Sequence, residues 1–162
     1  MDNISKCASM HDKTDAKLHS IKAMKGSGTQ FEDLVFIDSE TGFSKIRNDY
    51  NRKGEVLASK EMQKMVRNAK EYSIIAIHNH SHNNLPSAND LLNARDYKYR
   101  YGLILCHNSV IYKYAVARDA DVANADAYLD FVDKHIKENN FDKIANDLEE
   151  LKRNGVTLEI WK

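Results

Sequence analysis

This chain has no long apolar run, few cysteines and no excess of charge of either sign. No run approaches the roughly 20 apolar residues that cross a bilayer, and residues 1–6 carry no hydrophobic signal core. Two cysteines are too few for a disulfide framework. The 24 basic and 24 acidic residues balance, whereas nucleic-acid binders usually carry a basic excess. We therefore expect a cytoplasmic protein, or part of a larger virion-associated or secreted one, without a membrane or nucleic-acid partner.

The chain has the length of one domain, since 162 residues can build a core but are short for two domains. Apolar periodicity predicts the elements of its first half. An amphipathic helix, for example, carries apolar side chains at i, i+3, i+4 and i+7, here Met62, Met65, Val66 and Ala69. The predicted elements are a helix over 16–24, strands over 34–38 and 43–47 joined by a turn at 40–42, a loop at 52–54 and a helix over 59–71. A buried strand follows, with its apolar run over 73–77 and residues 78–80 at its end.

In the second half of the chain, helix and strand patterns continue to alternate, and two helix patterns follow them. We predict a helix over 87–97, strands over 101–106 and 110–116, two helices with apolar stripes over 128–136 and 141–151, and a short final strand over 156–161. This order predicts a single α/β domain with a mixed sheet flanked by helices. We divide it into a helix and flexible connector (1–28), a core (29–118) and a C-terminal helical extension (119–162).

The most informative segment follows the predicted buried strand. His78 and His80 are two residues apart, and side chains alternate along a strand, so both imidazoles project from one face. Pro86 and Ser87 resemble a helix entrance, and Asp90 three residues later falls in its first turn, over the strand end. Two histidines and one carboxylate, with water in a fourth position, are the ligands of a catalytic zinc site. Helix capping would explain Ser87 or Asp90 singly, but not the whole set.

The pattern H-x-H, six residues, S-x-x-D after a strand resembles the signature of the JAMM metalloproteases (MPN+ or JAB domains), which RadC-like proteins share. Residues 29–42 are similar to the opening strand of that domain, and residues 106–114 to its closing hairpin. The resemblance is greatest to bacterial and phage-borne members, including domains attached to phage minor head proteins and polymorphic toxins. It implies the JAB/MPN fold, with layers like those of cytidine deaminase.

The resemblance also implies chemistry. Zinc held by His78, His80 and Asp90 would activate water to hydrolyse a peptide or isopeptide amide in a peptide or protein substrate. Glu32 would act as the general base, and the Ser87 hydroxyl would donate to the oxyanion. Glu40 or Glu55 would replace Glu32 if the strand register differs.

Other histidines and the second cysteine have ordinary interpretations. We predict that His82 is a loop residue, that His107 is a surface turn residue, that His135 packs on the apolar face of its helix, and that Cys106 is a buried strand thiol.

Two other functions remain open. A JAB-like domain can be a non-catalytic binding or assembly module, phage-structural or toxin-associated. The string His78-Asn79-His80 also resembles metal-dependent ββα nucleases, which need these histidines in a hairpin followed by a helix. The sequence leaves the substrate and the oligomeric state undetermined.

Overall fold

The structure, a computed structural model, describes residues 31–53, 56–80 and 82–161. The predicted helix over 16–24, the connector that follows it, Gly54 and Glu55 lie outside these residues.

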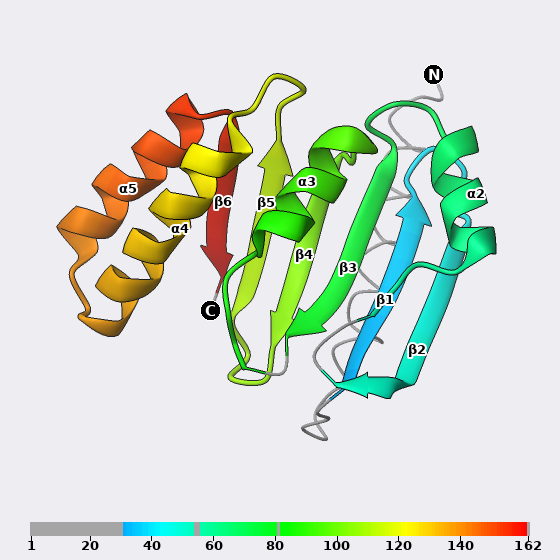
Figure 1. The fold of residues 1–162 in the computed structure, drawn as a ribbon, viewed down its shortest axis with the longest axis horizontal. Coiled ribbons are helices and arrows are strands. Elements are labelled where there is room, and N and C mark those ends of the chain that lie inside the picture. Colours follow the sequence, from blue (N-terminus) through cyan, green and yellow to red (C-terminus); the bar gives the residue numbers. More distant parts are fainter. Residues whose placement is uncertain (1–30, 54–55, 81, 162) are drawn as a thin grey trace, which may run out of the picture.

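A single mixed sheet organises the described part of the chain (Figure 1), as predicted. Its strand order is β2-β1-β3-β4-β5-β6. The β3–β4 pair is parallel and the other four pairs are antiparallel. The strands are β1 (Phe31–Asp38), β2 (Ser44–Lys53), β3 (Ile74–His80), β4 (Tyr101–Cys106), β5 (Ile111–Val116) and β6 (Val156–Trp161).

Four helices accompany the sheet in the described residues: α2 (Lys60–Asn68), α3 (Ala88–Asp96), α4 (Val122–Lys137) and α5 (Phe141–Arg153). Figure 1 shows α3 in front of β4, α2 beside β1 and β2, and α4 and α5 side by side next to β6. None of these helices has both the length and the apolar character that crossing a bilayer requires.

Each central strand contributes to two apolar clusters, because its side chains alternate between the faces of the sheet. On the helix-covered face, Phe36, Ala76 and Ile104 belong to the main core. On the opposite face, Ile77 and Leu103 belong to a second cluster and are almost fully buried. The strands read as apolar runs because both faces of the central strands are buried.

One predicted boundary is wrong. We expected a loop at 52–54, but β2 continues through Arg52 and Lys53, and Lys53 is paired with Phe31. The buried strand, by contrast, ends with His78-Asn79-His80 as predicted, and His80 is in register with Cys106 of β4. Backbone pairing with β4 holds these polar residues in the sheet, whatever their side chains are.

The C-terminal helices and strand form as predicted, and β6 pairs with β5 from Val156 to Trp161. The segment after residue 118 therefore completes the same sheet. His135 is buried between the two helices, as expected of a packing histidine, and its Nδ1 lies 2.6 Å from Asp147 Oδ2.

Candidate metal centre

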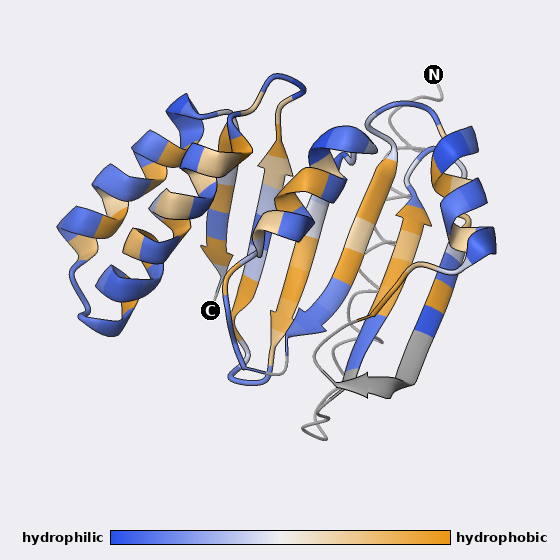
Figure 2. Ribbon diagram, viewed as in Figure 1, coloured by the Kyte–Doolittle hydropathy of each residue, from blue (hydrophilic) through white to orange (hydrophobic). Residues whose placement is uncertain are grey.

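His78 and His80 lie at the carboxyl end of β3, a central strand of the sheet. Figure 2 shows this strand changing from hydrophobic to hydrophilic toward that end. His78 is opposite Leu34 on one side and Ile104 on the other, so its side chain shares the helix-covered face with Ala76. The predicted alternation thus brings both rings to one face, where they lie 4.8 Å apart between centroids.

Asp90 reaches the two rings from the first turn of α3. Ser87 is the N-cap residue of this helix, and Ser87 and Asp90 form a capping box. The Ser87 amide and hydroxyl donate to Asp90 Oδ2 at 2.8 and 2.7 Å. The same contacts that start the helix also aim the carboxylate at β3, so the capping role of Asp90 is compatible with a role as a metal ligand.

The three side chains present their donor atoms to one point. His78 Nε2 lies 3.0 Å from His80 Nε2 and 3.3 Å from Asp90 Oδ1, and His80 Nε2 lies 3.6 Å from Asp90 Oδ2. Ligands at 2.0–2.1 Å from a tetrahedral ion are about 3.3 Å from one another. The spacing of this His78–His80–Asp90 cluster therefore suits a metal ion.

The tautomer of His80 is also the one a ligand needs. Its Nδ1–H donates to the carbonyl oxygen of Asn84 at 3.0 Å, because a carbonyl can only accept. In the neutral ring, Nε2 then carries a free lone pair directed at His78 and Asp90. Metal-bound histidines usually have such a partner on the other nitrogen. Two Nε2 atoms 3.0 Å apart need a proton or a cation between them.

Burial and charge work against each other in this cluster. Burial raises the pKa of Asp90, but His78, His80 and Ser87 outweigh it and hold the pKa of this carboxyl well below its usual range. Burial likewise lowers the pKa of His80, and the hydrogen bond and charge of Asp90, together with Glu32, raise it overall. The cluster thus stabilises one carboxylate and positive charge beside it.

Glu32 is the carboxylate that the fold brings to this centre. It is 9% exposed on β1, two residues before Leu34, and lines the same pocket as His78 and His80. Glu40, by contrast, is exposed in the turn at the far end of β1 and pairs with Lys70. Of these two candidates for the base, only Glu32 is near the cluster.

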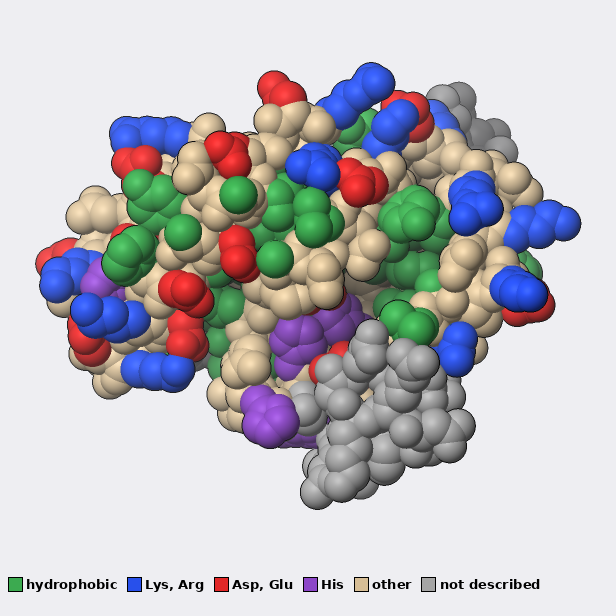
Figure 3. Space-filling view, viewed as in Figure 1, with side chains coloured by type: hydrophobic (Ala, Val, Ile, Leu, Met, Phe, Trp, Pro, Cys, Tyr) green, Lys and Arg blue, Asp and Glu red, His purple; other side chains and the backbone are tan. Residues whose placement is uncertain are grey.

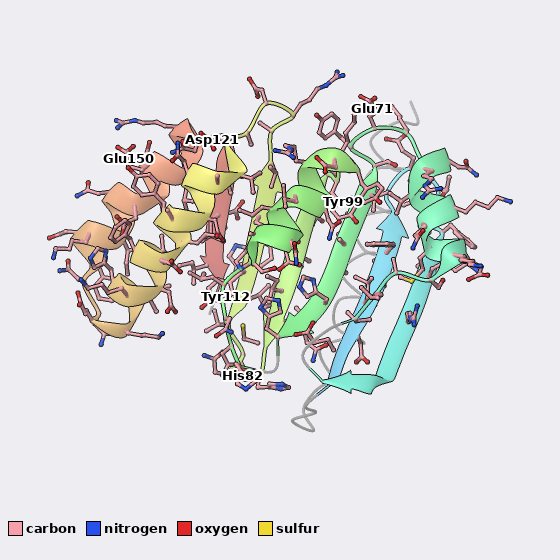
Figure 4. All side chains as sticks on the ribbon, viewed as in Figure 1. Glu71, His82, Tyr99, Tyr112, Asp121 and Glu150 are labelled. Atoms are coloured by element: carbon pink, nitrogen blue, oxygen red, sulfur yellow. The ribbon has the colours of Figure 1, made fainter. Side chains whose placement is uncertain are left out.

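The remaining predicted residues have mixed positions. His82 is exposed at the pocket rim, below the strands in Figure 4. Cys106 is buried in β4 as predicted, in register with His80, and burial raises its pKa to about 11, which makes it a poor thiolate. The prediction of a surface residue at His107 is only partly correct, because its Nε2 is buried and has no hydrogen-bond partner among the described residues.

One pocket of about 800 Å³ contains the cluster, Glu32 and Ser87. Figure 3 shows a central group of histidine side chains at one end of a hollow in which hydrophobic side chains are visible. Several pocket residues were missed by the sequence reasoning, because they are apolar or aromatic and look like core: Phe36, Leu57, Ala76, Tyr97, Tyr99 and Tyr114. A volume of this size is typical of small-molecule and substrate sites.

Comparisons of the chain with protein-family models, with curated proteins and with solved structures found no match. The geometry of the cluster and its pocket is therefore the basis for the functional interpretation.

Proposed function

We propose that this protein is a zinc-dependent hydrolase of the JAMM type, which cleaves a peptide or isopeptide amide bond. The observation that carries the proposal is the convergence of His78, His80 and Asp90 at 3.0–3.6 Å, inside a pocket that also holds a buried glutamate. Nitrogen and oxygen donors at tetrahedral spacing, with the pocket open beside them, suit catalytic zinc.

Zinc bound there would lower the pKa of a coordinated water to about 7 and polarise the amide carbonyl. The chain's own residues supply the proton transfers. Glu32, on the neighbouring strand, takes the proton from the attacking water and passes it to the leaving amine.

Ser87 supports this chemistry through Asp90. Its hydroxyl donates to Asp90 Oδ2 at 2.7 Å, and this hydrogen bond orients the carboxylate between the two imidazoles. The expected donation to the oxyanion requires the hydroxyl to leave this carboxylate when substrate enters. Ser87→Ala should therefore weaken metal binding as well as turnover, whereas an oxyanion donor alone would affect turnover only.

The proposal is tested first by metal content. Protein purified without chelator or added metal should hold about one zinc per chain by plasma mass spectrometry, and Asp90→Ala should lose it. Asp96→Ala is the matched control, because this aspartate is on the same helix but is exposed and paired with Arg95. No zinc in the unaltered protein, or zinc retained in Asp90→Ala, contradicts the ligand set.

The second step separates the enzyme from the binding module. Glu32→Gln should keep its zinc and lose cleavage of a peptide library read by mass spectrometry. If the unaltered protein holds zinc but cleaves neither peptides nor an isopeptide-linked conjugate, the binding or assembly module becomes the better interpretation. Against the nuclease, His78 and His80 lie in a central strand and not in a hairpin followed by a helix.

A further inference from the structure

The pocket at the metal centre continues into an apolar hollow between α2 and α3. Phe36 and Ala76 from the sheet, Tyr99 after α3 and Leu57 before α2 line this part of the pocket. Figure 3 shows hydrophobic side chains in a hollow next to the central group of histidine side chains. The reaction as described uses only the polar end of the pocket, so the apolar end needs its own explanation.

The floor of the hollow is a row of residues that lie opposite one another on neighbouring strands, next to the row that contains His78. Phe36, Ala76, Gly102 and Tyr114 are consecutive cross-strand partners. Ala76 comes two residues before His78, so this row lies about 7 Å along the strand from the metal row. Ala76 and Gly102 in the middle of the row carry a methyl group and no side chain, respectively, and the ring of Tyr114 lies over Gly102.

Tyr114 closes the floor at its far side. A Cβ at Gly102 would lie 2.1 Å from Tyr114 Cζ, so the ring covers the place where any other residue would put its side chain. Tyr114 is 2% exposed, and it nevertheless lines the pocket. No described residue forms a hydrogen bond with its hydroxyl, which is therefore available to a bound group.

The walls are aromatic and aliphatic. The rings of Phe36 and Tyr99 lie 5.6 Å apart at a tilt of 58°, and both line the pocket. Figure 4 shows Tyr99 in the region between α3 and α2. Leu57 is 45% exposed on the wall of this pocket.

We propose that this hollow is a specificity subsite, which accepts a large apolar or aromatic side chain of a peptide substrate next to the amide bond at the metal centre. The proposal rests on the hydrolase function above and names its substrate class. The apolar lining excludes charged side chains, since nothing charged in the floor row would compensate for their desolvation. The distance of one strand row fits a side chain of the residue adjoining the scissile bond.

The subsite is tested with two zinc-binding probes on zinc-loaded protein, measured by calorimetry. Acetohydroxamate fills only the metal end, whereas 3-phenylpropanohydroxamate adds a phenyl group that reaches the floor row. Burial of that ring should tighten binding on the order of 10- to 100-fold. Leu57→Asp should remove most of this gain and leave the affinity for acetohydroxamate unchanged.

Ile46→Asp is the matched control, because Ile46 is a 58% exposed aliphatic residue of β2 that does not line the pocket. It should alter neither affinity. Equal affinities of the two probes overturn the subsite, and so does a phenyl gain that survives Leu57→Asp. Cleaved library peptides should also carry Phe, Tyr, Leu or Met next to the cut, and small or charged residues there would contradict the proposal.

A different result is expected if the proposed hydrolase function is wrong and the protein binds no zinc. Neither hydroxamate would then bind through a metal, whereas 3-phenylpropionamide, which has no metal-binding group, would still test the apolar hollow. Binding of this amide that is lost in Leu57→Asp and kept in Ile46→Asp supports the apolar subsite even then. If protein without zinc does not bind this amide either, both the apolar subsite and the zinc hydrolase are overturned.

Discussion

Zinc should stabilise the fold strongly, because the ligand cluster exists only when β3 and α3 are packed together. The side chains of His78, His80 and Asp90 are 7%, 12% and 18% exposed. Without metal, their lone pairs face one another across 3.0–3.6 Å and need a shared proton. An ion removes this repulsion in the folded state and finds no comparable site in the unfolded chain.

The magnitude follows from binding linkage. Free zinc at 1,000 times its Kd adds about 4 kcal/mol to the free energy of unfolding. For a chain of this length, each kcal/mol raises Tm by about 2–4 °C, so the total shift is about 8–16 °C. Thermal unfolding of chelator-treated protein, followed by circular dichroism with and without zinc at pH 7.5, measures it.

Asp90→Ala should lose most of this shift, since the two imidazoles alone leave an incomplete ligand set, while Asp96→Ala should keep it. A zinc-dependent shift below about 2 °C at saturating metal, or an equal shift in Asp90→Ala, would refute the assignment of the ligands.

Three other predictions concern stability. Burial lowers the pKa of His80, but the neighbouring Asp90 carboxylate helps to raise it overall. The protonated ring therefore stabilises the folded state fully below about pH 6.5, and this stabilisation is lost as pH rises through the folded-state pKa. The urea midpoint of metal-free protein should therefore fall between pH 6 and 8.5, and a similar fall in His80→Gln would contradict this origin. Gly102→Ala forces its Cβ into the Tyr114 ring and should cost about 1–3 kcal/mol of unfolding free energy; recovery in the double variant with Tyr114→Leu checks that the clash is the cause. Asp147→Ala leaves Nδ1 of the buried His135 without its acceptor and should cost about 1–3 kcal/mol by urea unfolding, and a change below about 0.5 kcal/mol would show that water replaces the carboxylate.

The predictions from sequence succeeded where the signal is local. The alternation of His78 and His80, the helix start at Ser87 and the apolar stripes of the C-terminal helices depend on neighbours within a few residues, and the structure shows each of them. The prediction of a loop at 52–54 failed because charged residues next to a glycine normally indicate a loop. Here the partner strand β1 continues alongside, and Phe31 pairs with Lys53.

The sequence by itself indicated the candidate ligand cluster, since two imidazoles at i and i+2 share a strand face and Asp90 lies three residues after the N-cap residue of the next helix. Only the tertiary structure decided what surrounds these ligands. The pairing of β1 with β3 brings Glu32 to the centre and leaves Glu40 at the opposite end. The register across four strands aligns Phe36, Ala76, Gly102 and Tyr114 in one row, and three of them, Phe36, Ala76 and Tyr114, line the pocket. These contacts join residues far apart in the chain, so strand order and register fix them, and neither can be read from local periodicity.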